Sequence, residues 1–134
     1  MKFDRRLTDE IYTSDTVRLG KNAFQAMRET IYHNGGVGTI AGYYDAELSI
    51  LSVSDLLLHN LNHSYESLME QTKGSLKNLF YKKDATFLDN ACFRQIQGEG
   101  EGRILTADGS PVYVRLYKKD AFDTDGTPIW IMSV

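Results

Sequence analysis

The sequence predicts an α+β fold in which antiparallel strands make up the C-terminal part of the chain. Two turn clusters, residues 107–110 and 123–126, contain Asp-Gly and separate three runs rich in β-branched and aromatic residues. Asp-Gly tolerates the positive φ that tight hairpin turns need, so each cluster predicts a reversal between antiparallel strands. A helical hydrophobic pattern before residue 34 and short helical segments in the middle of the chain complete the assignment.

The composition is that of one soluble globular domain. Of the 134 residues, 42% are hydrophobic and 25% are charged, and the formal net charge is −3. This balance lacks the electrostatic footprint of a nucleic-acid or anionic-membrane binder, and the basic pairs at residues 5–6, 82–83 and 118–119 are interpreted as solvated positions. The sequence shows no signal peptide and no apolar run of about 18 residues. We therefore expect a cytoplasmic location, no nucleic-acid partner and no membrane insertion.

The first 34 residues are predicted to form a helical extension. Phe3, Leu7 and Ile11 recur at a spacing of four, which allows a short amphipathic helix. A stronger helical pattern runs over residues 16–33 and ends at a Gly-Gly pair that favours a left-handed stop. Its apolar stripe should comprise Ala23, Met27 and Ile31, joined by Leu19, Gly20 and Phe24.

Between residues 35 and 97 the chain is predicted to form a hairpin and then a series of helices. Residues 37–44 and 48–55 are typical of two short strands around a turn. Ser and Asp side chains mark the helix starts, because they accept hydrogen bonds from the free backbone N–H groups there. The expected helices are residues 56–61 after Asp55, 65–71 after Ser64, 75–80, and a longer one at 85–97 after Asp84.

Three motif clusters follow this order of elements. Residues 50–55 (Ile-Leu-Ser-Val-Ser-Asp) lead to residues 61–68 (Leu-Asn-His-Ser-Tyr-Glu-Ser-Leu), and residues 75–84 read Ser-Leu-Lys-Asn-Leu-Phe-Tyr-Lys-Lys-Asp. Residues 101–110 read Glu-Gly-Arg-Ile-Leu-Thr-Ala-Asp-Gly-Ser, and residues 125–130 read Asp-Gly-Thr-Pro-Ile-Trp. In this order and spacing the clusters resemble a PAS domain, the sensory module of bacterial signal-transduction proteins.

The sequence departs from the PAS pattern at three places. Asn62-His63 stands where the family usually has Gly-Tyr, and Tyr81-Lys82 stands where it usually has His-Pro. The family's usual Asp-Ile-Thr exit is missing, and Ser133-Val134 occupies the place where that connector would begin. We therefore expect a sensor from which the output domain has been left off.

The resemblance implies a five-stranded antiparallel sheet in the order 2-1-5-4-3, with short helices and one longer helix on one face and a pocket between them. It divides the chain into the N-terminal helical extension, residues 1–34, and a sensor domain, residues 35–134. The implied function is to bind a small ligand, to mediate dimerisation, or both, and so to control an output domain of histidine kinase (two-component) or diguanylate cyclase type. The alternative is a ligand-free scaffold for dimerisation or protein interaction. No nucleophile–base pair or carboxylate dyad can be placed, so no catalytic residue is expected.

Cofactor and metal assignments find little support in the residues. The run Asn-Ala-Cys-Phe-Arg-Gln at residues 90–95 is similar to the Asn-Cys-Arg-Phe-Leu-Gln of flavin-binding PAS domains, but the inserted Ala rotates Cys92 by about 100° on a helix. A buried structural cysteine is the preferred interpretation. The predicted helix at 85–97 has no His for haem. His59 and His63 lie four residues apart without an evident third ligand, so surface or capping roles are preferred to a metal site. The cofactor stays unknown, with a small organic ligand as the remaining option.

The Gly-rich start of the first C-terminal strand has two interpretations. Glu99 and Glu101 should point to one face of the strand, and Gly100 and Gly102 to the other. The carboxylates then form a solvated charged edge, or the glycines face the pocket and leave room for a ligand.

The other two C-terminal strands are partly apolar on both faces, which predicts a sheet covered on both sides. Short helices can cover one face. The amphipathic helix at residues 16–33, from the same or a second chain, can cover the other. We therefore expect a homodimer built on that helix and the outer sheet face.

The predicted ligand-binding residues are aromatic or hydrogen-bonding groups near the gap between sheet and helices. Arginine in such a site favours a carboxylate-bearing ligand, and the alternative is a surface Arg that pairs with Glu99 or Glu101. The candidates are Tyr43, Phe87, Arg103, Tyr113, Arg115 and Trp130.

Overall fold

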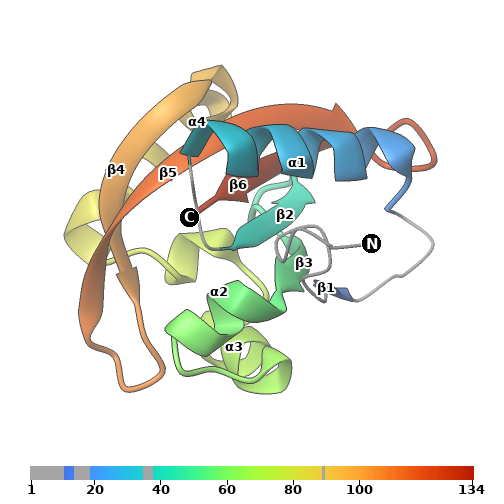
Figure 1. The fold of residues 1–134 in the computed structure, drawn as a ribbon. Coiled ribbons are helices and arrows are strands. Elements are labelled where there is room, and N and C mark those ends of the chain that lie inside the picture. Colours follow the sequence, from blue (N-terminus) through green and yellow to red (C-terminus); the bar gives the residue numbers. More distant parts are fainter. Residues whose placement is uncertain (1–10, 14–18, 35–37, 89) are drawn as a thin grey trace.

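The computed structural model describes residues 11–13, 19–34, 38–88 and 90–134. For residues 11–13, 33–34, 86–87 and 90–92 only the backbone is described. Figure 1 shows a curved sheet with helices on both faces. In chain order the elements are β1 (Ile11–Thr13), α1 (Lys21–Asn34), β2 (Thr39–Tyr43), β3 (Ile50–Ser54), α2 (Asp55–Asn60), α3 (Tyr65–Thr72), the 3-10 helices η3 (Leu76–Asn78) and η4 (Lys82–Leu88), α4 (Asn90–Gln95), β4 (Gly98–Leu105), β5 (Pro111–Phe122) and β6 (Pro128–Ser133).

The described strands form one antiparallel sheet in the order β1-β3-β2-β6-β5-β4. Numbered without β1, the other five strands have the order 2-1-5-4-3, so the predicted topology is confirmed. Strand β1 is an addition at the β3 edge, with Tyr12 paired to Val53. The short helix expected to include Ile11 is therefore wrong at this residue, because the β-branched and aromatic run Ile-Tyr-Thr pairs with an otherwise open strand. Phe3 and Leu7 lie outside the described residues.

The three C-terminal strands form the predicted meander. Gly109, in the β4–β5 turn, has φ +86°, and Gly126, in the β5–β6 turn, has φ +81°. Such a left-handed backbone is adopted most easily by glycine, which explains the Asp-Gly sequence of both turns. In the second turn the Asp123 carboxylate also accepts hydrogen bonds from the Asp125 and Thr127 N–H groups, at 2.8 and 2.9 Å.

The inner face of the sheet is covered by α2, α3, α4 and the two 3-10 helices (Figure 1). Its core includes large side chains from the sheet, such as Trp130 and Met132, packed with leucines of the helices and with Phe93 of α4. The Phe93 ring meets the Trp130 ring edge-on, with centroids 5.7 Å apart. Burial of this apolar surface is the main stabilising contribution of the face.

The outer face is covered in part by α1, which lies across β5 and β6 of the same chain (Figure 1). Ala23, Met27 and Ile31 are buried as predicted, whereas Phe24 is 42% exposed and does not join them. Ala26 takes the inward position, because a helical turn of 3.6 residues places it beside Ala23 and Met27. The Ser133 hydroxyl donates to the Thr30 carbonyl at 2.8 Å, which joins β6 to α1.

The region predicted as one long helix after Asp84 is divided in two. The chain first forms η4, then α4, and Asp84 lies inside η4 instead of capping a helix. Its carboxylate accepts hydrogen bonds from Arg103, so it is not available to an α-helical N-terminus. The cap of α2 also differs from the prediction, whereas the predicted cap of α3 is confirmed. Ser54 rather than Asp55 caps α2, and Ser64 caps α3 in a capping box completed by Ser67.

Candidate functional site

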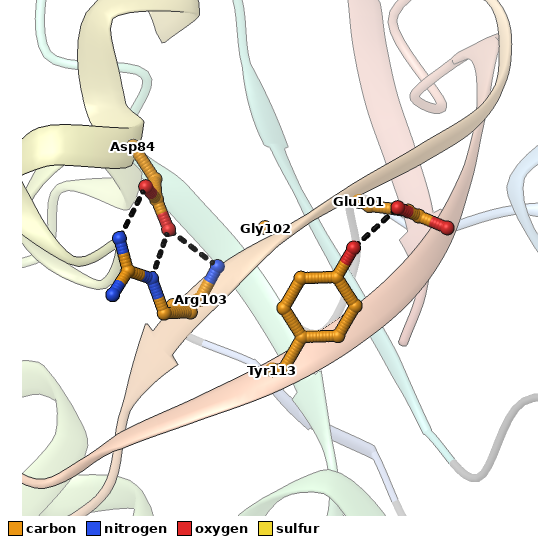
Figure 2. Close-up of a pocket in the computed structure, with 5 residues that line it drawn as sticks. All are labelled: Asp84, Glu101, Gly102, Arg103 and Tyr113. Atoms are coloured by element: carbon orange, nitrogen blue, oxygen red, sulfur yellow. Dashed lines mark hydrogen bonds and ion pairs between the residues drawn. The ribbon is translucent and has the colours of Figure 1, made fainter.

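The candidate site is an open depression on the outer face, at the end of the sheet that α1 leaves uncovered (Figure 2). Its volume is about 600 Å³. Strand β4 contributes Glu101, Gly102 and Arg103, strand β5 contributes Tyr113, and η4 contributes Asp84. All the side chains that line it are polar or charged, apart from the aromatic ring of Tyr113.

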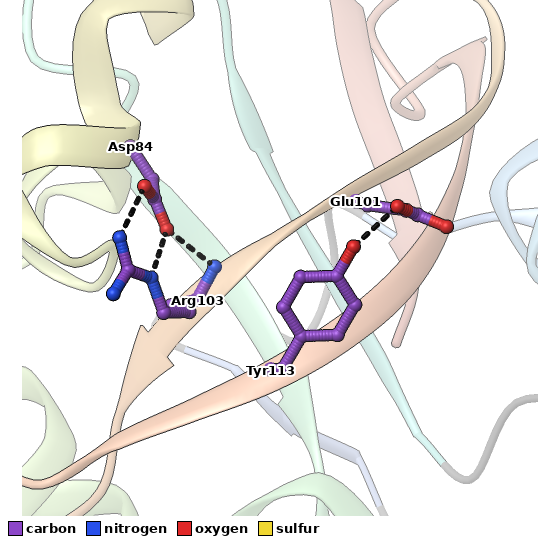
Figure 3. Close-up of polar contacts among 4 residues, drawn as sticks. All are labelled: Asp84, Glu101, Arg103 and Tyr113. Carbon is purple, nitrogen blue, oxygen red and sulfur yellow. Dashed lines mark hydrogen bonds and ion pairs between the residues drawn. The ribbon is translucent and has the colours of Figure 1, made fainter.

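Asp84 and Arg103 form a two-pronged ion pair. The Arg103 Nε donates to Asp84 Oδ2 at 2.8 Å and Nη2 donates to Oδ1 at 2.9 Å, and the Arg103 backbone N–H also donates to Oδ2 at 3.0 Å (Figure 3). The hydrogen bonds from the Arg103 side chain hold the pKa of Asp84 below its ordinary value, and the pKa of Arg103 is raised by the same contact. Such paired geometry fixes the orientation of both groups.

The segment before η4 pairs with the edge of the sheet, and this pairing brings Asp84 to Arg103. Residues 79–81 run beside β4, where the Leu105 N–H donates to the Leu79 carbonyl and the Tyr81 N–H donates to the Arg103 carbonyl, both at 2.8 Å. Helix η4 therefore begins next to Arg103. The Tyr81 ring also lies under the guanidinium, 4.3 Å from its carbon, so the cation contacts an aromatic face as well as a carboxylate.

Glu101 and Tyr113 form the second polar pair of the depression. The Tyr113 hydroxyl donates to the Glu101 carboxylate, and this contact raises the pKa of Tyr113 (Figure 3). Arg103 lies directly opposite Tyr113 in the ladder, and Glu101 lies opposite Arg115. Residues opposite each other share a face of the sheet, so these four side chains form one polar patch.

Gly100 and Gly102 of β4 face the core instead of an open cavity. A Cβ atom at Gly100 would lie 3.1 Å from Leu116 Cδ1, and one at Gly102 would lie 3.4 Å from Phe80 Cε1. The space left by the missing side chains is thus occupied by the chain's own residues. Glu99 and Glu101 are exposed, in agreement with the charged edge, the first of the two interpretations of this segment.

Comparison with known proteins supports the fold through structure alone. No family model and no curated protein matches the sequence. The crystal structure of the PAS domain of HTR-like protein from Haloarcula marismortui superposes with a TM-score of 0.57, over 81% of this chain and 93% of that chain. The two sequences are 16% identical. The chain has the PAS fold. None of the described helices is long and apolar enough to cross a membrane.

Within the PAS fold, the six predicted ligand-binding residues fall into separate places. Arg103 and Tyr113 line the depression, and Arg115 follows on the same face. Trp130 is fully buried in the inner core. The list is completed by Phe87, whose side chain lies outside the described residues, and by Tyr43.

Tyr43 of β2 and Trp130 of β6 are joined by a hydrogen bond between the two neighbouring strands. The Trp130 Nε1 donates to the Tyr43 carbonyl at 2.9 Å. The Tyr43 hydroxyl donates to Asp123 Oδ2 at 2.9 Å, on the side of the sheet that carries α1. Their polar atoms thus make contacts that fasten the sheet and its last turn.

A buried charged cluster at the end of α4 was missed by the sequence interpretation. Lys118 was expected to be solvated, but its side chain is fully buried on the inner face. Its ammonium donates to the Ile96 carbonyl at 2.8 Å and to Asp120 at 3.1 Å, and it lies about 5 Å from the Tyr44 and Phe93 ring centres. Burial lowers the pKa of Lys118, and burial also raises the pKa of Tyr44, which donates to Asp120. The alternation along β5 was the available signal, because Lys118 shares its face with Leu116.

His59 and His63 lie in different surroundings. His63 is buried and its Nδ1 lies 2.6 Å from the Ser67 hydroxyl, whereas His59 is exposed. Among the described residues, no group of three or more His, Cys, Asp or Glu side chains gathers in a way that could hold a metal ion. The side chain of Cys92 lies outside the described residues.

Proposed function

We propose that this chain is a regulatory PAS module that controls a covalently attached output domain, of histidine kinase or diguanylate cyclase type, by a change in the packing of α1 on the sheet. The PAS fold itself supports a sensory role. The main support for the mechanism is the position of α1, which packs on β5 and β6 and shares the bond from Ser133 to Thr30. A signal that moves the sheet would alter the packing of α1, because packed elements change between discrete arrangements. Catalysis would reside in the output domain.

The depression on the outer face is the proposed ligand site. Asp84 takes only two of the five side-chain N–H donors of Arg103. The remaining donors could bind a carboxylate, with Tyr113 and Arg115 beside them on the same face. A carboxylate-bearing small molecule is therefore the proposed ligand class.

A thermal-shift screen with small carboxylic acids tests this proposal. A real site raises the melting temperature with ligand concentration, because binding to the native state alone stabilises it. Arg103→Ala should abolish the shift, and Glu70→Ala, an exposed change on α3, should leave it intact. No shift with any compound, together with no small molecule in mass spectrometry of the purified protein, would count against ligand binding.

The second candidate function is a scaffold for dimerisation without a ligand. It is favoured by the inner face, where Trp130 and Phe93 are buried side by side and fill the space with the chain's own side chains. We propose that a homodimer forms through the outward side of α1 and the outer sheet face. Phe24, Arg28 and Tyr32 follow each other at a spacing of four on this helix, and Tyr32 is 82% exposed. Aromatic residues and Arg are enriched at interfaces.

Sedimentation equilibrium over the micromolar range tests the dimer. The unaltered chain should sediment as a dimer, and Phe24→Ser with Tyr32→Ser should shift it to a monomer of unchanged circular dichroism. A purely monomeric unaltered chain would exclude this interface.

A further inference from the structure

Strand β4 lies at the edge of the sheet, and its outer side is hydrogen-bonded over only part of its length. Residues 79–81 and Asp84 form hydrogen bonds with the backbone groups of Leu105 and Arg103 along this edge. The segment at residues 79–81 runs antiparallel to β4, with Phe80 opposite Ile104. It therefore acts as a short added strand that ends at Arg103.

Beyond Arg103 the edge is open at Glu101 and Glu99. In an antiparallel strand the N–H and C=O groups of every second residue point to the same side. The Arg103 groups point to the free edge, so those of Glu101 and Glu99 do too, while Gly102 and Gly100 pair with Val114 and Leu116 on β5. In the described ranges of the chain, no backbone hydrogen bond reaches this side of Glu99 or Glu101.

The side chains of this segment specify what a further strand should contain. Glu99 and Glu101 are exposed on the outer face, so residues opposite them should be basic. On the inner face, Gly100 and Gly102 have no side chains and lie against Leu116 and Phe80. Residues of the added strand that point to this face would contact apolar atoms, so they should be apolar.

We propose that the edge of β4 at residues 99–101 binds an extended peptide segment in which basic and apolar residues alternate, added antiparallel to β4 in line with residues 79–81. Main-chain hydrogen bonds would supply affinity, and the alternating side chains would supply specificity. The occupant is a partner of this chemistry rather than a second copy of the chain. Two such edges paired with each other would place glutamates opposite glutamates, which is destabilising. The site adjoins the proposed ligand depression, which Glu101 also lines, but its test uses a peptide and does not depend on a ligand or a dimer.

The probe is a fluorescein-labelled peptide, Thr-Lys-Val-Lys-Val-Lys-Thr, titrated with the protein and followed by fluorescence anisotropy. Residues directly opposite Glu99 and Glu101 direct their own N–H groups toward β4. N-methylation of the lysines should therefore weaken binding by about tenfold or more, the effect of losing about 1.4 kcal/mol. N-methylation of the valines, whose N–H groups face away, should leave it unchanged. Equal binding of all three peptides, which carry the same charge, would mean electrostatic attraction alone and would overturn the proposal.

The protein side is tested with a matched pair of charge reversals. Glu101→Lys should weaken binding by roughly fivefold, because a favourable cross-strand pair becomes a repulsive one. Glu70→Lys, on α3, changes the net charge by the same amount and should have no effect. Equal loss in both variants would contradict the edge site.

Hydrogen exchange of the unaltered protein locates the peptide without any variant. The Glu99 and Glu101 amides should become protected on saturation with the probe. Protection elsewhere, with these amides unchanged, would show that the peptide binds at another surface.

Discussion

The two ends of the outer sheet face differ in what lies against them. At one end, α1 approaches closely because small residues meet, with Ala23 and Ala26 of the helix near Ala41 and Ala121 of the sheet. At the other end, β4 and the start of β5 carry long polar side chains that no described helix covers. There Asp84 pairs with Arg103, and Glu101 pairs with Tyr113.

The difference separates stability from recognition within one face. The covered end gains free energy by removing apolar surface from water. Exposed ion pairs contribute little to stability, since water and salt screen them. The open end is therefore free to change its side chains for binding at small cost in folding, and the covered end is not.

The largest expected effect is at the covered end. Ile131 is 0% exposed and lies in the cluster beneath α1. Ile131→Ala should lower the free energy of unfolding by about 3 kcal/mol, since it removes buried methyl groups and leaves a cavity. Urea denaturation followed by circular dichroism measures this change.

The matched control is Glu99→Ala at the open end of the outer face, where the side chain is exposed. It should change the same free energy by about 0.5 kcal/mol or less. Similar losses in the two variants would contradict the contrast between the ends.

A smaller effect is expected where α1 meets the last strand. Ser133→Ala removes the hydroxyl that donates to the Thr30 carbonyl. The loss should be about 1 kcal/mol, typical of a single intramolecular hydrogen bond. Hydrogen exchange should show faster opening of α1 with α2 unchanged, and uniform acceleration over both helices would mean that the bond does not act locally.

Much of the fold could be predicted because the strand signals are local. The Asp-Gly turns at Gly109 and Gly126 and the alternation in β5 determine the meander from neighbouring residues alone. The division of the predicted long helix could not be derived in this way. It depends on the contact of Asp84 with Arg103, 19 residues later, and a side chain that can cap a helix can also pair elsewhere.

The candidate site was predictable only in part, for the same reason. Arg103 and Tyr113 share a face by strand alternation, and the alternative that Arg pairs with a nearby acid proved to involve Asp84 instead of Glu99 or Glu101. The alternation in β5 places Lys118 on the inner face, but its partner there is the carbonyl of Ile96, the residue after α4, and this contact could not be derived from β5 alone. The residue type alone predicted a solvated lysine, but its position on the inner face buries the side chain.

A milder change at the open end concerns the Asp84–Arg103 pair. Asp84→Asn keeps the shape of the side chain but removes its charge, so the Arg103 amide should exchange faster with solvent. The effect on global stability should be too small to resolve in denaturation, because both side chains are partly exposed, at 23% and 40%. A large loss of stability would mean that this pair holds η4 to the sheet more strongly than an exposed ion pair should.

The smallest effect concerns the turn that joins β4 and β5. The Asp108 carboxylate accepts from the Thr106 hydroxyl at 2.6 Å and from the Ser110 N–H at 3.0 Å. These bonds, the first above all, lower the pKa of Asp108 to about 2. Because the folded-state pKa is below the unfolded value of about 3.9, the stabilisation is complete above that value and is lost as the pH falls toward the folded-state pKa.

Carboxyl-carbon NMR titration checks this directly, and Thr106→Val should raise the pKa of Asp108 toward its ordinary value. An unchanged pKa of Asp108 in the Thr106 variant would assign the shift to the backbone of the turn rather than to the threonine hydroxyl.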